Sequence, residues 1–371
     1  MKIISLLWGY SLGGIGKVAL TYGKLNEISN INVQTIVIQP RSVEVDLSSL
    51  NSIESKCIFI RNRFDPSWIK KIKYEIKNNN PDILFVHGFN GPIIGLLQKL
   101  FFKNLTLVCS YHGLYHPTTN FRRLLAPIFN FLPIPIYYKY ADRIITVEKH
   151  SKSVLVSKGI PISKIDVVYN GLPAIKSEQR FDISKWGLSV DNFIIGCASR
   201  IDPVKGISYL IEAFVQLHQI YGSKFKLVII GEGTVKTELE KKAAELGVSK
   251  SIIFTGYQNN ISDWLNVFDI FVLPSLAEYH SIGLLEAMRA KKAIVATNVG
   301  GNTESVRHLK EGVIVNSKNS KQLYDAINQL YNDKTLAIKL GQAAYIRFNN
   351  KFSEKATMGN LVDVFNSIIK K

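Results

Sequence analysis

The 371-residue sequence is poor in cysteine, with only three. Cys57, Cys109 and Cys197 each lie in an apolar run, and no two of them form a Cys-x-x-Cys pair. This pattern argues against a disulfide-stapled fold and is typical of buried, reduced thiols in a cytosolic protein. The chain must therefore be held together by ordinary packed cores, for which its hydrophobic content of 46% is ample.

The sequence also lacks a long uninterrupted hydrophobic run. The longest apolar stretch, residues 124–138, is shorter than a membrane-crossing helix requires and contains three prolines. At the start, MKIISLLW runs into glycine without a small-residue cleavage site, so we expect a first strand there and not a signal peptide. We expect no transmembrane segment and a cytoplasmic location.

Acidic residues are few: 29 Asp and Glu stand against 46 Lys and Arg, which gives a formal net charge of +17. The excess is uneven, because residues 1–180 hold 23 basic against 11 acidic side chains. Such a field attracts anionic partners, namely nucleic acid, anionic lipid or phosphorylated metabolites, but it does not determine the fold. A lysine-rich surface that only aids solubility is the alternative explanation.

Strand-like and helix-like segments alternate along the chain, which predicts parallel sheets covered by helices. A polar stretch over residues 176–191 separates two such series. We predict an α/β protein with two Rossmann-like domains, residues 1–178 and 179–353, and a ligand in the cleft between them. The expected strands are residues 3–8, 33–38, 56–60, 82–86, 105–110 and 143–147 in the first domain, and 193–198, 225–230, 252–254, 269–273, 293–296 and 312–315 in the second.

Two glutamates, Glu278 and Glu286, follow the apolar run 270–273. The run predicts a buried parallel strand, and the apolar spacing from Ile282 predicts a helix capped by Ser281. The glutamates are then on the loop and the early helix, at the edge where open parallel sheets bind ligands. Because a carboxylate accepts hydrogen bonds from two hydroxyls, the pair suits a ribose and a hexose. Chance spacing is the alternative.

Cations and glycine turns follow the neighbouring strands. Arg200 and Lys205 lie on one strand-to-helix loop, where they can neutralise a diphosphate, although the segment suits a solvated turn equally well. Glycines at 231, 233, 300 and 301 permit close backbone approach. In the first domain, the glycine-rich residues 9–20 fit neither a Walker A loop nor a nicotinamide-dinucleotide fingerprint, which needs an acid after the second strand.

A histidine, His112, follows the strand 105–110, and His87 occupies a similar place after an earlier strand. Metal binding by His112 and His116 is disfavoured, because Gly113 argues against a helix and no glutamate follows the first histidine. We expect His112 to touch a substrate, with a hydrogen-bonded core histidine as the alternative.

Together these residues resemble the nucleotide-sugar glycosyltransferases of the GT-B fold, specifically the retaining family 4 type. The resemblance extends over nearly the whole chain, and its order and spacing are specific. The motifs that carry it are Gly13-Gly14, His112-Gly113, Ala141-Asp142, Asn170-Gly171, Arg200 with Lys205-Gly206, Gly231-x-Gly233, Pro274-Ser275-x-x-Glu278, Glu278-x7-Glu286-Ala287 and Gly300-Gly301-x-x-Glu304.

The resemblance implies that a hexose or N-acetylhexosamine moves from a UDP- or GDP-sugar to a saccharide, without a bound metal. It implies that Glu286 holds the nucleotide ribose and that Glu278 contacts the donor sugar. Arg200 and Lys205 are implied to clamp the diphosphate, and His112 to lie near the transferred sugar.

The resemblance also implies backbone contacts. The donor is expected to meet N–H groups of Ser281, Ile282, Gly283 and Leu284, and glycine turns at Gly231 and, from the facing domain, at Gly13 and Gly14. We expect backbone near Tyr257 to read the base, and a helix over about residues 354–371 to cross back onto the first domain. The segment Tyr279–Ile282 departs from the commonest family pattern, so the donor sugar and a contact from His280 stay open.

In this fold the first domain selects the acceptor, and its sequence shows the fewest recognisable motifs. Residues 121–140 mix Arg122, Arg123 and Lys139 with aromatic and aliphatic residues, which suits an anionic membrane surface. We therefore expect a peripheral enzyme that extends a lipid-linked saccharide for cell-envelope polysaccharide or glycolipid; a buried helix with a proline-rich loop is the alternative. The rival functions are a sugar-nucleotide epimerase or hydrolase on the same fold, and a non-catalytic nucleotide- or nucleic-acid-binding protein. We expect no nucleic-acid partner: such binding needs basic and aromatic residues interleaved on one element and a steep salt dependence, and nothing in the sequence requires either.

Overall fold

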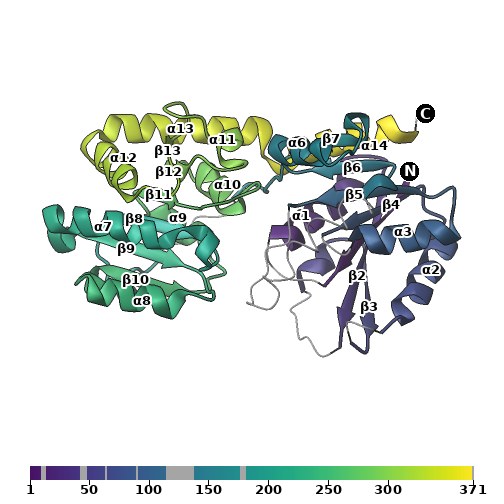
Figure 1. The fold of residues 1–371 in the computed structure, drawn as a ribbon, viewed down its shortest axis with the longest axis horizontal. Helices are drawn as coiled ribbons and strands as arrows, with labels where there is room; N and C mark the ends of the chain where they lie inside the picture. Colours follow the sequence, from purple (N-terminus) through teal and green to yellow (C-terminus); the bar gives the residue numbers. More distant parts are fainter. Residues whose placement is uncertain are drawn as a thin grey trace. The chain divides into compact units, whose positions relative to one another are not determined.

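A computed structural model of the chain consists of two α/β units (Figure 1). It describes residues 1–9, 14–41, 48–62, 65–88, 91–113, 138–175 and 181–369. The first unit comprises Met1–Gly171 and Glu354–Lys371, and the second Leu172–Ser353. The division thus falls a few residues before position 178, the expected boundary, which lies outside the described residues.

The first unit is built on a seven-stranded sheet in which every pairing is parallel, with the order β3-β2-β1-β4-β5-β6-β7. Its strands are apolar and buried along most of their length, as expected for a sheet covered on both faces. The six strands predicted for this half are confirmed. They are β1 (Lys2–Trp8), β2 (Asn32–Pro40), β3 (Ser55–Ile60), β4 (Ile83–His87), β5 (Thr106–Tyr111) and β6 (Arg143–Thr146), and β7 (Ile165–Val167) follows them.

Helices cover both faces of this sheet (Figure 1). The last helix of the chain packs on the first unit, since Phe365 meets the ring of Phe85 edge-on at 5.4 Å. At its start, Lys24 pairs with Glu354 at 3.0 Å. The helices of this unit are α1 (Gly14–Gly23), α2 (Ser67–Asn79), α3 (Gly91–Phe101), α6 (Lys149–Ser157) and α14 (Glu354–Ile369).

The second unit has a six-stranded parallel sheet with the order β10-β9-β8-β11-β12-β13. All six strands predicted for this half are confirmed: β8 (Phe193–Ala198), β9 (Phe225–Ile230), β10 (Ile252–Gly256), β11 (Ile270–Leu273), β12 (Ala293–Thr297) and β13 (Val313–Val315). The helices are α7 (Ile207–Tyr221), α8 (Lys236–Glu245), α9 (Ile261–Val267), α10 (Ile282–Arg289), α11 (Asn302–Ser305), α12 (Ser320–Asn332) and α13 (Lys334–Lys351).

Both sheets reverse their strand order at one point. In the second unit β9 lies on one side of β8 and β11 on the other, so the chain leaves β8 and β11 in opposite directions. Such a switch point opens a crevice at the carboxyl ends of the two strands. The first unit has the same arrangement, with β1 between β2 and β4.

The thiols and the surface agree with much of the sequence-based prediction. Cys109 and Cys197 are buried, and burial raises the pKa of Cys197 to about 12. Cys57 is only partly buried, because β3 is an edge strand.

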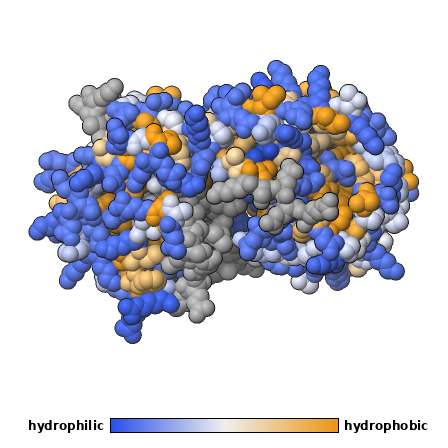
Figure 2. Space-filling view, turned by 180° about the vertical axis from the view of Figure 1, so that it is seen from behind, coloured by the Kyte–Doolittle hydropathy of each residue, from blue (hydrophilic) through white to orange (hydrophobic). Residues whose placement is uncertain are grey.

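The face in Figure 2 is largely hydrophilic, with hydrophobic side chains in smaller areas. Among the described helices, none has the length and apolarity to cross a membrane.

Candidate active site

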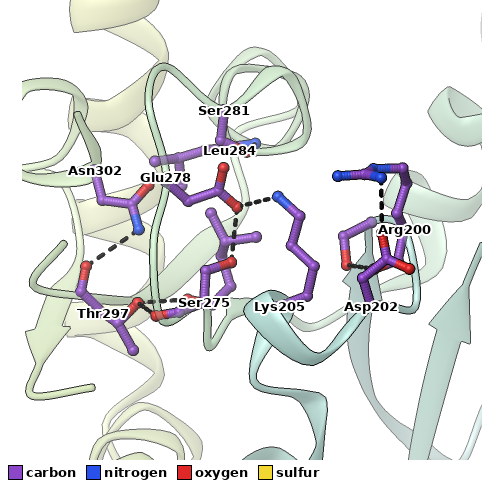
Figure 3. Close-up of polar contacts among 11 residues, drawn as sticks. Arg200, Asp202, Lys205, Ser275, Glu278, Ser281, Leu284, Thr297 and Asn302 are labelled. Atoms are coloured by element: carbon purple, nitrogen blue, oxygen red, sulfur yellow. Dashed lines mark hydrogen bonds and ion pairs between the residues drawn. The ribbon is translucent and has the colours of Figure 1, made fainter. Parts of the chain in front are cut away.

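The switch point of the second unit brings together the loops that follow β8 and β11. Lys205, after β8, donates a hydrogen bond from Nζ to Glu278 Oε1 at 2.6 Å, and Ser275 Oγ donates to the same oxygen at 2.7 Å (Figure 3). The two charged side chains are only 16% and 8% exposed. Charges removed from water this far are strongly destabilising unless they are paired. Glu278 and Lys205 therefore depend on each other.

The second cation of the same loop is held less firmly. Arg200 Nη1 lies 2.7 Å from Asp202 Oδ2, but the Arg200 side chain is 61% exposed, so water screens the pair. Asp202 is more enclosed and also accepts hydrogen bonds from the backbone N–H and the hydroxyl of Thr234, at 3.3 and 3.1 Å. Asp202 thus ties the loop after β8 to the glycine turn after β9.

Three glycines let these loops approach one another. A Cβ added to Gly206, where φ is +63°, would lie 2.2 Å from the carbonyl oxygen of Pro274. One added to Gly231, where φ is +137°, would lie 2.0 Å from the oxygen of Ser199. At Gly283 it would meet the oxygen of Ala198 at 2.8 Å. Side chains at these positions would push apart the loops that carry the charged residues.

Helix α10 begins as predicted. Ser281 is its N-cap, and its hydroxyl accepts a hydrogen bond from the N–H of Leu284 at 3.4 Å. Its first turn therefore comprises Ile282, Gly283 and Leu284, and a helix N-terminus favours an anion. Glu286 follows on the helix and is 7% exposed, while Glu278 is on the preceding loop. Burial lowers the pKa of Arg289, and nearby Glu286 opposes that shift.

The remaining predicted site residues of the second unit lie at the same sheet edge or in the core. Tyr257 follows β10 and is 61% exposed. Next to it, the backbone N–H of Gly231 donates to the carbonyl of Gly256 at 2.9 Å. His280, which the sequence left open as a donor contact, is 4% exposed and packs on Phe352 with ring centroids 5.1 Å apart. It is a core residue in this structure.

In the first unit, His112 lies just beyond β5. Its Nε2 is 2.9 Å from Ser110 Oγ. Although part of the residue reaches the surface, burial of the ring lowers the pKa of His112 to about 4, so the imidazole is neutral at pH 7. Gly14 is the first residue of α1, and Gly13 lies outside the described residues.

No group of three or more His, Cys, Asp or Glu side chains within the described ranges is arranged to hold a metal ion. The polar atoms around Glu278 come instead from a lysine and a serine.

Comparison with known proteins identifies the family. Residues 178–347 match the model of "Glycosyl transferases group 1", and residues 44–174 match that of "Glycosyltransferase Family 4". The two matches together cover most of the chain and include both units. The chain is a glycosyltransferase of the group 1, family 4 type. The family and the GT-B fold inferred from its motifs are confirmed, and the retaining mechanism stays a prediction.

Relatives and solved structures agree with this assignment. The glycosyltransferase is 31% identical over 205 residues to an uncharacterized glycosyltransferase of Methanocaldococcus jannaschii, covering 52% of this chain and about half, 51%, of that protein. It is 26% identical to an Escherichia coli UDP-Gal:alpha-D-GlcNAc-diphosphoundecaprenol alpha-1,3-galactosyltransferase, over 71% of this chain and 70% of the relative. The structure of Anabaena HepE with UDP-glucose superposes with a TM-score of 0.80 at 20% identity, covering 99% of this chain and 100% of that one. This last likeness establishes the GT-B fold.

Sequence reasoning missed several residues that shape the site. Neither the contacts of Asp202 nor the hydrogen bond from Ser275 to Glu278 was predicted. The Thr297 hydroxyl donates to the carbonyl of Ser275 at 2.6 Å, and Asn302 Nδ2 donates to the carbonyl of Thr297 at 3.1 Å (Figure 3). A small polar residue at the end of each neighbouring strand was the available signal, because parallel strands end at a common edge.

The buried His280 predicts a pH-dependent stability. Burial lowers its pKa to about 3, so below pH 6.5 the unfolded chain binds a proton that the folded chain does not. The stability is full above pH 6.5 and falls as the pH drops toward 3. We expect the free energy of unfolding to fall between pH 6 and 4 more steeply in the wild type than in His280→Leu, by up to about 1.4 kcal/mol per pH unit.

Urea unfolding curves at pH 7, 6, 5 and 4 measure this slope. His280→Gln is the matched variant, because it also removes the titrating ring but keeps a polar side chain, and it should show the same shallower slope as His280→Leu. Equal slopes in the wild type and His280→Leu would show that His280 does not resist protonation.

Proposed function

We propose that this glycosyltransferase retains the anomeric configuration of the hexose or N-acetylhexosamine that it moves from a UDP- or GDP-sugar to a saccharide acceptor. The observation that carries the donor assignment is the arrangement of Lys205, Glu278 and Arg200 beside the start of α10. Two cations and a helix N-terminus suit a diphosphate. A carboxylate beside Lys205 suits the hydroxyls of the attached sugar.

In this proposal a bound diphosphate replaces the carboxylates of Glu278 and Asp202 as the partner of the two cations. In the structure Lys205 is paired with Glu278 and Arg200 with Asp202. A bound diphosphate attracts both cations, and Glu278, released from Lys205, accepts hydrogen bonds from sugar hydroxyls. As the glycosidic bond breaks, negative charge grows on the departing nucleotide, so fixed cations stabilise the transition state more than the ground state. We propose that no metal is required.

The other roles follow the family resemblance. We propose that Glu286 binds the ribose, and that backbone near Gly231 and Tyr257 contacts the nucleotide. The second unit is then the donor domain, and the first unit with α14 is the acceptor domain. In the first unit, we propose that His112 contacts the transferred sugar and that Gly13 and Gly14 approach the donor.

We propose a lipid-linked saccharide as the acceptor, in the synthesis of cell-envelope polysaccharide or glycolipid. The names of two relatives support this class of acceptor. The Escherichia coli enzyme is named for a diphosphoundecaprenol-linked sugar, and a Campylobacter jejuni relative, 26% identical, for a diphospho-undecaprenol-linked saccharide. Such an acceptor is anchored in a membrane, so the enzyme must reach the membrane surface.

We propose that the first unit makes this contact at the cytoplasmic face. Most of the basic segment 121–140 lies outside the described residues, but α2 and α3 present a second candidate surface. Tyr74, Leu100 and Phe101 are 62%, 68% and 52% exposed, and the ammonium of Lys73 lies 4.1 Å from the centroid of the Phe101 ring. The exposed lysines of α2 are Lys70, Lys71, Lys73 and Lys77. Cations beside exposed apolar side chains suit anionic headgroups.

The donor role of the second unit is tested by incubating the enzyme with a panel of UDP- and GDP-sugars, with and without lipid-linked acceptors. We expect free nucleotide and a glycosylated product only when the acceptor is present. Glu286→Ala should weaken nucleotide binding by about tenfold or more, because a hydrogen-bonded carboxylate is lost. Glu240→Ala on the exposed face of α8 is the matched control and should bind normally.

Three outcomes would favour the rivals. Free nucleotide without a glycosylated product would favour a hydrolase, and an altered sugar on the nucleotide an epimerase. Nucleotide binding with neither reaction would favour a non-catalytic binding protein.

Membrane contact is tested by sedimentation with vesicles of anionic and of neutral lipid at low salt. We expect binding only to anionic vesicles. Replacing the four α2 lysines by Gln should weaken it by at least about 100-fold, since each lysine near an anionic surface contributes about 1 kcal/mol. The matched control replaces four exposed lysines of the second unit, Lys241, Lys250, Lys310 and Lys339. An equal loss in both variants, or no wild-type binding, would contradict the proposal.

A further inference from the structure

A continuous chain of hydrogen bonds crosses the first sheet and ends at His112. Ser5 Oγ on β1 lies 2.9 Å from Nε2 of His87, the last residue of β4. Nδ1 of His87 lies 3.0 Å from Ser110 Oγ on β5, and the same oxygen lies 2.9 Å from Nε2 of His112. The chain follows from the strand order β1-β4-β5, which brings these residues side by side at the switch point. Ser5, His87 and Ser110 are almost completely buried.

The neutral imidazoles of His87 and His112 must both carry their proton on Nδ1 or both carry it on Nε2. A neutral imidazole has one N–H donor and one acceptor, and a serine hydroxyl has a single proton to donate. If His87 donates from Nδ1, then Ser110 donates to Nε2 of His112, whose proton is on Nδ1. If Ser110 donates to His87 instead, then His112 donates from Nε2, and His87 carries its proton on Nε2. Either way both rings have the same tautomer.

Burial keeps both rings neutral, which this coupling requires. The rings of Phe85 and Tyr22 lie 4.2 and 5.8 Å from that of His87, between centroids. Burial lowers the pKa of His87 well below its ordinary value, and His112 adds to the shift. The pKa of His112 is lowered to about 4 for the same reason.

The Ser5 end of this series of hydrogen bonds determines the direction in which the groups donate their protons. Within the described part of the first unit, His87 is the hydrogen-bond partner recorded for the Ser5 hydroxyl. A buried hydroxyl that fails to donate is destabilising, so Ser5 donates to His87 Nε2. Each group in the series then donates its hydrogen bond in the direction of His112. His112 accepts at Nε2, keeps its proton on Nδ1 and offers an N–H donor on the edge away from Ser110.

We propose that His87 and Ser110 are positioning residues that fix the orientation and the Nδ1–H tautomer of His112, so that it presents a donor to an oxygen of the transferred sugar. The inference rests on the proposed contact between His112 and that sugar. His87 itself is too deeply buried to meet the substrate, and acts through Ser110. The sequence places His87 in a position similar to that of His112, and we assign it the support of His112 in place of a substrate contact.

Nitrogen-15 NMR of histidine-labelled enzyme reads the ring tautomers directly, and the chain has only seven histidines. Signals are assigned with His87→Gln and His112→Gln. We expect His87 and His112 to be neutral Nδ1–H tautomers between pH 5.5 and 8. In Ser110→Ala, His112 should become a mixture of tautomers, whereas Ser110→Thr, which keeps the hydroxyl, should retain the wild-type signal.

Kinetics supply the second readout. We expect Ser110→Ala to lower kcat by about tenfold with little change in the KM of the nucleotide-sugar, and Ser110→Thr to restore most of it. Ser151→Ala is the matched control. Ser151 is a buried, hydrogen-bonded serine of the same unit, and it takes no part in the series of hydrogen bonds from Ser5 to His112. It should leave the His112 tautomer and kcat unchanged even if it lowers the thermal midpoint.

Opposite tautomers in the two rings, or an unchanged His112 signal in Ser110→Ala, would overturn the proposal while leaving glycosyl transfer intact. A wild-type enzyme with the expected signals but no transfer activity would support the coupling and count against the proposed function alone.

Discussion

The ion pair between Lys205 and Glu278 is the interaction on which the candidate active site of this glycosyltransferase depends. Its partners are 73 residues apart in the chain and follow β8 and β11, the strands at which the second sheet reverses its order. Both side chains are largely removed from water, so neither is stable there without the other. The glycine at 206 is required for the same reason, because any side chain would separate the two loops.

In this structure each cation of the loop after β8 is paired with a carboxylate. Lys205 is held by Glu278 and Arg200 by Asp202, so each cation has a carboxylate that a diphosphate can replace. In the proposed mechanism, ligand binding converts Glu278 from a partner of Lys205 into an acceptor for sugar hydroxyls.

The order and type of the elements could be predicted from the sequence, because apolar strands and amphipathic helices alternate with clear periods. The start of α10 was predictable to the residue, since Ser281 precedes a helical pattern. The partners within the site were not, because periodicity tells which edge a residue reaches but not which side chain it meets. The family resemblance assigned Lys205 to the diphosphate and Glu278 to the sugar, and only the fold pairs them. The burial of His280 and the chain from Ser5 to His112 likewise depend on strands that are adjacent in space and distant in sequence.

Calorimetric titration with UDP and GDP tests the exchange of partners most directly. For whichever nucleotide the wild type binds, Lys205→Met should weaken binding by about tenfold or more, since a charge-assisted contact to the diphosphate is lost. Glu278→Gln should bind the same nucleotide at least as tightly as the wild type, because Lys205 no longer has a competing carboxylate. If Glu278→Gln weakens nucleotide binding as much as Lys205→Met does, the pair supports the fold of the site and does not yield to a diphosphate.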